Sequence, residues 1–525
     1  MKTLPMLCLL AAAASAAEPQ DIQLPEPELA PLANLAWTLP PKYATLDGDR
    51  LVVDIPAGAY PASAVARAEL PSALFAGAKG FSMEVEAEGS ALAKPTKSYL
   101  GLKFQMRWTE SATGRREWPN CRNKIGDFPA TVLRNDAVFG DAHPDSIELQ
   151  LGLQETSGRV VFDLSTLRGA PTQGTFRRIN ADFVIRYPDG DSARRRGVML
   201  PQRDPTEEDF ETLAAWGVTL VRYQMTRNWH GVGDNRDLDE FGAWLDGKLD
   251  CLEKVVIPCA RKHGIKVVVD MHVVPGGRDA AREPAMFREK VYADAFVDAW
   301  RRIAARFKGN ADAIYGYDLV NEPVQIGRAP FDWWTLQRLA AEAVREIDPD
   351  APIVFETHSW DSPEAFADLS PLRMDNVVYQ VHCYKPGEFT HQGVHGPVGA
   401  VWPDPSKGWD RDYIRKRLAP VREFEKRHGA KIYVGEFSAI AWAKGADEYI
   451  RDCIAVFEEF GWDWTYHAFR EWNGWSVEHE GPDSKHMVPS EDNPRKRALL
   501  DGFRGAVLSE KPEPAAPHPR KEPTP

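Results

Sequence analysis

The chain has 525 residues, too many for one typical hydrophobic core, so we expect two domains with tails. Its formal net charge is −13 and no basic run dominates, which excludes nucleic acid and an anionic membrane as favoured partners. Its six cysteines are sparse, and no CxxC or HExxH motif occurs, which excludes a disulfide framework and a structural zinc site. We expect no metal and no cofactor.

The first residues predict an export signal. Lys2 precedes an apolar run from Leu4 to Ala14, and the small residues "ASAA" follow, as is typical of a secretory signal peptide over residues 1–17. We therefore expect a secreted or periplasmic protein. No later stretch reaches the roughly 20 apolar residues of a membrane span, so no membrane contact is expected after cleavage. Residues 18–31 are Pro-rich and acidic and predict a leader or linker.

Residues 32–172 predict an antiparallel β-sandwich. Runs such as "FSMEVEAEG", "YLGLKFQMRW" and "SIELQLGLQ" alternate apolar and polar residues with a period of two. Turn residues (Gly, Pro and Asp) separate the runs, and little of this region is typical of helix.

Residues 176–505 predict a (β/α)8 TIM barrel, because short β-branched runs alternate there with long amphipathic stretches. The eight runs are "RRGVMLP" (195–201), "TLVRYQM" (219–225), "KVVVDMH" (266–272), "YGYDLVNEP" (315–323), "PIVFET" (352–357), "NVVYQVHCY" (376–384), "KIYVGEFS" (431–438) and "WTYHAFREW" (464–472). The first helix is expected to begin with a capping box at Thr206 and to stop at Gly217. A doubly wound sheet is the alternative, but it would more often show a Gly-rich turn after its first strand.

Residues 509–525 cannot build a core and predict a disordered tail.

Polar side chains follow these strands at the ends where barrel enzymes place their chemistry. They are Arg222, His272, Asn321, Glu322, Glu356, His382, Tyr384 and Glu436. Glu322 and Glu436 each come directly after an apolar run. Two carboxylates across a barrel mouth suit glycosidic bond cleavage, because one must donate a proton and the other must attack the anomeric carbon. For Glu356, substrate contact and a solvated loop are equally good interpretations.

Five motifs together resemble glycoside hydrolase family 5, the cellulase-type family with carboxylates at strands four and seven. They are "YDLVNEP", "VVVDMH", "QVHCY", "IYVGEFS" and the Arg of "TLVRYQ". The resemblance covers roughly residues 176–505 and implies Glu322 as acid/base and Glu436 as nucleophile. It implies that Asn321 bonds the sugar 2-hydroxyl and that Arg222 and Tyr384 hold Glu436 ionised. It also implies that His272 and His382 line the subsite at the cleavage point.

The chain departs from that family pattern at strand eight, where "TYHAFREW" places His467 at the usual Trp position. Trp472 or Trp475 is expected to supply the sugar platform instead, because sugar faces stack on indole rings. Further stacking candidates in the loops after the strands are Trp229, Trp360 and Trp402.

The N-terminal segment "IELQLGLQETSGRVVFDLSTL" resembles the last strands of galactose-binding-like jelly-roll domains. That resemblance implies a carbohydrate-binding module over residues 32–172. A purely structural sandwich docked on the barrel is the alternative.

Together these features predict a secreted retaining glycoside hydrolase of the endoglucanase or mannanase type, acting on β-linked polysaccharide or oligosaccharide. One alternative is a noncatalytic polysaccharide-binding protein on a barrel scaffold, which would not need both Glu322 and Glu436. Another is a different barrel enzyme such as a lyase, which would need a strand-end Lys or metal ligands that the eight runs lack.

Overall fold

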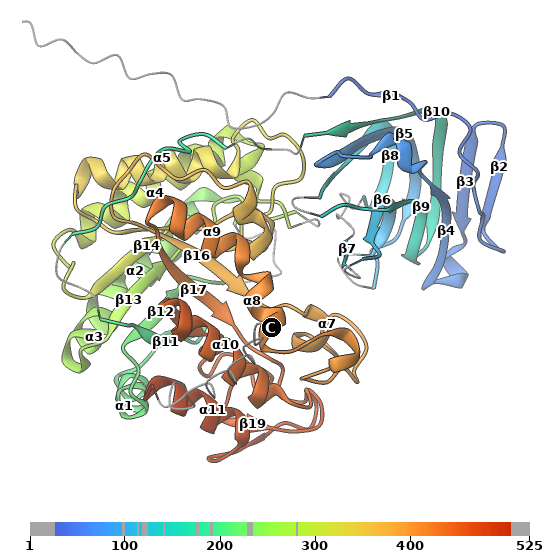
Figure 1. Cartoon of the computed structure of the whole chain (residues 1–525). Helices are drawn as coiled ribbons and strands as arrows, with labels where there is room; N and C mark the ends of the chain where they lie inside the picture. The colour runs from blue at the N-terminus through green and yellow to red at the C-terminus, as the bar shows by residue number, and fades with distance from the viewer. Residues whose placement is uncertain are drawn as a thin grey trace, which may run out of the picture.

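The computed structural model describes residues 27–505 except 97–99, 113–114, 118–123, 140–141, 174–175, 177, 189–192, 228–234 and 280–281. The predicted signal peptide (1–17) and tail (509–525) lie outside these residues, as does Trp229. Figure 1 shows two bodies side by side, a strand-rich unit formed by the N-terminal part and a larger helix-covered barrel.

The larger unit is a closed barrel of eight parallel strands in sequence order, which confirms the predicted fold. The strands are β11 (Arg196–Met199), β12 (Leu220–Gln224), β13 (Lys266–Asp270), β14 (Ile314–Asp318), β15 (Ile353–Phe355), β16 (Val377–Cys383), β17 (Lys431–Phe437) and β18 (Asp463–Tyr466). Most of their residues are buried, as expected when helices cover a parallel sheet.

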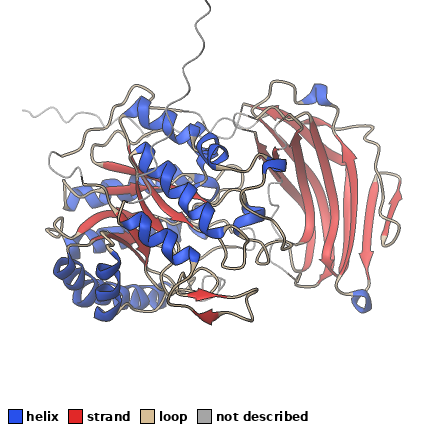
Figure 2. Ribbon diagram, turned by 60° about the horizontal axis from the view of Figure 1, so that its bottom comes forward, coloured by secondary structure: helices blue, strands red, loops and turns tan. Residues whose placement is uncertain are grey.

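Helices surround the barrel on its outside (Figure 2). The helical segments of this part of the chain are α1 (Glu207–Trp216), α2 (Leu238–Cys251), α3 (Ile257–His263), α4 (Lys290–Phe307), α5 (Trp333–Ile347), α6 (His358–Asp361), α7 (Gly387–Thr390), α8 (Arg411–Arg417), α9 (Ala419–His428), α10 (Ala446–Phe460) and α11 (Pro494–Phe503). Of these, α6 is a single short turn after β15 that contains residues with non-helical backbone angles. The α1 capping box between Thr206 and Asp209 forms as predicted, and Gly217 ends the helix with φ +91°. None of the described helices is long and apolar enough to cross a membrane.

The N-terminal unit consists of two antiparallel sheets, as predicted for a sandwich. One has the order β2-β3-β10-β5-β8 with β1 beside β10, and the other β4-β9-β6-β7. Their bounds are β1 (Ala30–Pro31), β2 (Ala44–Asp47), β3 (Arg50–Ile55), β4 (Ala62–Glu69), β5 (Gly80–Leu92), β6 (Gly101–Glu110), β7 (Arg115–Glu117), β8 (Gly126–Val138), β9 (Ser146–Thr156) and β10 (Gly158–Thr172). Residues 30–31, predicted as leader, therefore belong to the sheet. A short hairpin, β19 (His479–Glu480) with β20 (Val488–Pro489), follows the barrel.

The two units have separate hydrophobic cores. The sandwich core contains buried residues between Leu51 and Leu167, and the main barrel core contains residues from Phe176 onward. The units meet at β8, where a Cβ placed on Gly327 would lie 2.5 Å from Asp136 Oδ2. Gly327 belongs to the loop between β14 and α5, which begins next to the predicted acid/base.

Candidate active site

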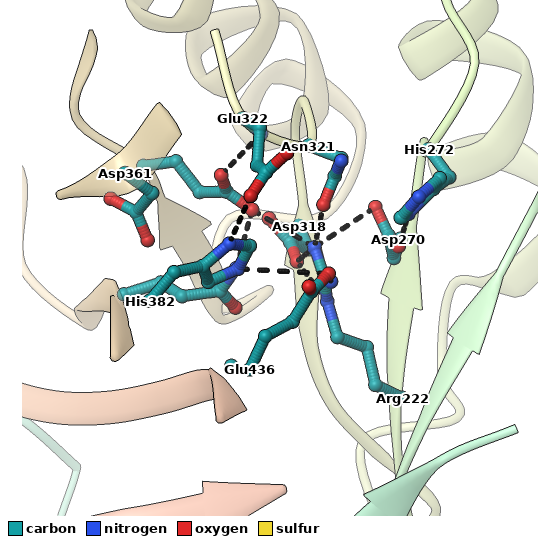
Figure 3. A network of polar contacts seen from close by, with 12 residues as sticks. Arg222, Asp270, His272, Asp318, Asn321, Glu322, Asp361, His382 and Glu436 are labelled. Carbon is teal, nitrogen blue, oxygen red and sulfur yellow. Dashed lines mark hydrogen bonds and ion pairs between the residues drawn. The ribbon is translucent and has the colours of Figure 1, made fainter. Parts of the chain in front are cut away.

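The parallel register brings the predicted polar residues to one end of the barrel. Gln224, Asp270 and Asp318 are paired across β12, β13 and β14, so they lie at the same level. His382 is likewise paired with Glu436 across β16 and β17, after a register shift. Figure 3 shows the resulting cluster, with Glu322 and Glu436 entering it from opposite sides.

Arg222, fully buried on β12, is the centre of this cluster. Its guanidinium donates to Glu436 Oε1 at 2.6 Å, Asp318 Oδ2 at 2.9 Å and Asn321 Oδ1 at 3.0 Å. It also donates to Glu356 Oε1 at 2.9 Å and lies 3.3 Å from Asp270 Oδ1. A rigid, planar set of donors suits this task, since each N–H meets a different oxygen.

Glu436 is held as an anion by its surroundings. Tyr384 donates its hydroxyl to Oε2 at 2.8 Å, while Arg222 binds Oε1. Burial would raise the pKa of Glu436, but the opposing charges of His382, His467 and Arg222 lower it far below its usual range. An ionised, fixed carboxylate at this position is suited to nucleophilic attack.

Glu322 occupies an unusual backbone conformation just beyond β14. Its φ is +47°, a left-handed value that is uncommon for residues with a side chain. Its N–H donates to Glu356 Oε2 at 2.6 Å, and Arg278 donates to its carbonyl at 2.9 Å. His382 Nδ1 lies 3.0 Å from Glu322 Oε1. Burial would lower the pKa of His382, but Glu436 and Glu322 raise it to about 9.

Glu356 lies inside the cluster, so the solvated-loop interpretation is wrong: the residue is completely buried. One oxygen accepts from Arg222 and from Gln380 Nε2, and the other accepts the Glu322 N–H. Glu356 therefore connects the residue that binds Glu436 with the backbone that carries Glu322.

Two predicted substrate contacts have further roles in the structure. His272 Nδ1 lies 2.8 Å from Asp270 Oδ2, which fixes the orientation of the ring. Asn321 uses its oxygen for Arg222, while its buried Nδ2 has no hydrogen-bond partner among the described residues.

Four buried members of the cluster were not in the predicted set. Asp270 and Asp318 end their strands inside the quoted motifs, so their position could have indicated them. Gln380 has no such signal, since it lies within β16. Asp361 comes from a turn in which Ser359, Trp360 and Asp361 all have positive φ, which no sequence pattern indicated.

The aromatic candidates differ in exposure. Trp472 is 37% exposed and lies edge-on to Trp442 and Trp475, with ring centroids 5.9 and 5.8 Å apart, so it can still serve as a platform. Trp402 cannot, because it is buried and donates its indole N–H to Asp452 at 3.0 Å. Trp475 is buried as well, and Trp360 is half-buried.

His467 stands beside Tyr384, with ring centroids 6.1 Å apart, and its Nε2 lies 3.4 Å from Glu471 Oε1. Burial would lower the pKa of His467, but Glu471 raises it above its usual value. A polar, partly charged ring therefore occupies the position where the family resemblance leads one to expect an indole.

Two triads have ligand atoms within 4.8 Å of one another, a spacing that would also fit a metal ion: Glu322, His382 and Glu436, and Glu356, Asp361 and His382. Both share His382. In the structure one ring nitrogen of His382 lies 3.0 Å from Glu322 Oε1 and the other lies 3.1 Å from Gln380 Nε2, so both nitrogens have protein partners.

A closed parallel barrel with two carboxylates facing each other at strands four and seven defines the class of barrel glycosidases. The model of the cellulase family, glycosyl hydrolase family 5, matches residues 189–475. The chain therefore belongs to glycosyl hydrolase family 5.

The chain is similar to curated relatives and to solved structures. Endoglucanase C of Acetivibrio thermocellus is 27% identical over 299 residues, which is 50% of this chain and 83% of that protein. Cellodextrinase A of Ruminococcus flavefaciens is 26% identical over 277 residues, covering 51% and 79%. The structure of Thermotoga maritima Cel5A in complex with mannotriose is 22% identical, covers 59% of this chain and 98% of that chain, and has a TM-score of 0.46.

Proposed function

We propose that the protein is a secreted retaining β-glycosidase of the endoglucanase or mannanase type. Its substrate would be a β-linked glucan or a related polysaccharide or oligosaccharide. Family membership supports the glycosidase activity, and the names of the curated relatives support a β-glucan substrate.

The spacing of the two carboxylates carries the proposal for retention. A Glu322 oxygen and a Glu436 oxygen lie within 4.8 Å of each other. Retaining glycosidases hold their carboxyl groups about 5–5.5 Å apart, whereas inverting enzymes need about 6.5–9.5 Å for an intervening water. The short distance between these two oxygens therefore favours the retaining arrangement over the inverting one.

In the proposed mechanism Glu436 attacks the anomeric carbon, and Glu322 protonates the departing oxygen. Arg222 and Tyr384 keep Glu436 ionised, and they hold its two oxygens in place before substrate arrives. Asn321 Nδ2 donates to the sugar hydroxyl next to the anomeric carbon. Water then hydrolyses the glycosyl-enzyme, with Glu322 acting as base.

The first test concerns the nucleophile and the stereochemistry. NMR of the first-formed product should show the β-anomer for the unmodified enzyme. Glu436→Ala should abolish turnover, and added azide should restore part of it while giving the α-glycosyl azide. Glu342→Ala, an acidic residue on α5, is the control and should retain activity. An initial α-anomer, or full activity of Glu436→Ala, would refute the assignment.

The second test concerns the acid/base. Glu322→Gln should slow cleavage of substrates with poor leaving groups by about 10²–10⁴-fold, the typical contribution of general acid catalysis. Aryl glycosides release a phenolate that needs no proton from the enzyme. Formation of the glycosyl-enzyme from these substrates should therefore be slowed far less than for substrates with poor leaving groups. Equal slowing of both substrate types would show that Glu322 does not protonate the leaving group.

The third test concerns export. We propose that residues 1–17 direct secretion and are removed. N-terminal sequencing of protein recovered outside the cytoplasm should begin after Ala17. If the protein is found in the cytoplasm with Met1 still present, the proposal of export is contradicted.

A further inference from the structure

The sandwich contains a groove that the proposed hydrolysis does not use. It lies on the outward face of the sheet β4-β9-β6-β7 and encloses about 680 Å³, within the range of ligand sites. The described lining residues are Thr38, Leu39, Pro40, Pro41, Ser63, Val65, Arg67, Leu100, Lys103, Gln105, Arg107, Gln150 and Gln154.

Strand alternation creates the polar floor. On β6, Phe104, Met106 and Trp108 point into the sandwich core and are fully buried. Lys103, Gln105 and Arg107 alternate with them and line the groove, as do Gln150 and Gln154 on β9.

A glycine lies in the middle of this floor. Gly152 is paired with Lys103 on one side and Val65 on the other, so no side chain of β9 fills the space between them. Its φ is +151°, and a Cβ would lie 2.2 Å from the Ala64 carbonyl oxygen. Only glycine fits this position, which leaves the floor open.

The segment before β2 supplies a side wall. Thr38 pairs with Arg67 through two backbone hydrogen bonds of 2.8 and 3.0 Å, and this contact covers the edge of β4. Leu39, Pro40 and Pro41 continue from there along the groove. Two successive prolines limit the conformations available to this wall.

The charge of the groove contrasts with that of the chain. The groove is lined by three cations, Lys103, Arg107 and Arg67, and no carboxylate is among its described lining residues. Three glutamines supply amide donors and acceptors. The whole chain carries −13. Glu148, beside the groove, lies 3.8 Å from Arg67, is paired across the strands with Arg107 and accepts from Gln150 at 2.7 Å, so its carboxylate offsets part of this positive charge.

We propose that this groove binds a carboxylate-bearing oligosaccharide segment, such as a run of uronic acid residues. The cations would pair with the carboxylates, and the amides would bond the hydroxyls. The described lining residues offer cations and amides, so the recognition proposed here uses hydrogen bonds and charge. The choice of a saccharide over another polyanion rests on the proposed glycosidase function of the same chain.

The test uses the full chain carrying Glu436→Ala, so that bound polymer is not cut. Affinity electrophoresis in polygalacturonate should retard the protein, and added salt should reduce the effect. Arg107→Gln should weaken binding by about tenfold, the effect of losing one charge-assisted hydrogen bond. Arg159→Gln on β10, which makes the same charge change on the other sheet, is the matched control and should bind normally.

Two outcomes would overturn the proposal. One is that neither Arg107→Gln nor Arg67→Gln weakens retardation by polygalacturonate, and the other is equal retardation by polyglutamate, which has carboxylates but no sugar. In a chain that keeps Glu436, the Arg107→Gln substitution should leave the turnover of short β-glucan oligosaccharides unchanged. Loss of groove binding therefore remains distinguishable from failure of the proposed hydrolysis.

Discussion

At the residue scale, Arg222 determines how the site is arranged, because one buried cation contacts four carboxylates from four strands or strand ends. Removing one partner of such a network leaves buried charge uncompensated, so its members are expected to act as a unit. Glu356 is the member with the widest reach, since it contacts both Arg222 and the backbone of Glu322.

We predict that Glu356→Gln lowers kcat by about 100-fold, the effect of misplacing reacting groups by about 1 Å. Both carboxylate oxygens of Glu356 accept hydrogen bonds from N–H groups. Whichever way the glutamine amide of the variant is turned, its NH₂ group therefore faces one of these donors instead of accepting from it. Glu356→Asp should recover part of the activity, and Glu364→Gln on the following turn should remain active. Kinetics with a soluble β-glucan would measure this, and an unchanged kcat in Glu356→Gln would contradict the positioning role.

The raised pKa of His382 gives a pH-dependent stability. A histidine with an ordinary pKa near 6.5 when unfolded and about 9 when folded stabilises the native state below pH 6.5. That contribution is lost as the pH rises through about 9. We predict that the melting temperature of the unmodified protein exceeds that of His382→Gln by several degrees at pH 6.

The measurement is thermal unfolding of both proteins from pH 6 to pH 10. Comparing the two removes the titration of groups that they share. The gap should narrow between pH 6.5 and 9, and a gap that widens over this range would show that the ring is not charged in the native state.

Sequence reasoning at this scale found the residues that follow strands and missed those that do not. Arg222, Asn321, Glu322 and Glu436 stood in motifs at strand ends, where a barrel gathers its chemistry. Asp361 could not be found in that way, because it reaches the site through a left-handed turn. The burial of Trp402 was also missed, since a loop position gives no indication of what packs over it.

At the element scale, the eight strands and the α1 cap followed directly from periodicity and capping residues. The loop after β14 did not. Its first turn holds Glu322 at φ +47°, and hydrogen bonds from Arg278 to the carbonyls of Asn321 and Glu322 fix it there. Contacts formed only in the folded barrel therefore impose a conformation that the local sequence does not prefer.

This conformation predicts an order of stabilities. Glu322→Gly and Glu322→Ala lose the same carboxylate, but only alanine retains a Cβ in the left-handed region. The glycine variant should be more stable by about 1 kcal/mol in urea unfolding. On helix α5 the same pair at Glu342 should show the reverse order, with glycine less stable by about 1 kcal/mol. Equal stability of the two Glu322 variants would mean that the turn relaxes without the side chain.

At the scale of the whole molecule, the sandwich and the barrel have separate hydrophobic cores, and the two units meet where Asp136 lies against Gly327. Composition and periodicity predicted this division near residue 176. They could not indicate how the units dock, because the contact of Asp136 with Gly327 joins residues almost two hundred positions apart.

We predict that calorimetry resolves two unfolding transitions, since separate cores unfold separately unless their interface is large and apolar. Leu151→Ala, in the sandwich core, should lower one transition, and Leu245→Ala, in the barrel core, should lower the other. Each buried leucine contributes about 2–5 kcal/mol. A single transition lowered by both substitutions would show that the units fold as one.

The contact between Asp136 and Gly327 also has an evolutionary consequence. Asp136 accepts hydrogen bonds from Ser82 and Arg134 within the sandwich, so a new side chain at position 327 would have to displace a carboxylate that already has partners. Gly327 itself has φ +66°, a value that asparagine tolerates as well as glycine in an open loop. Homologous barrels that carry this sandwich should therefore keep glycine here, whereas those that lack it are free to drift to asparagine, so the residue would record the history of the fusion.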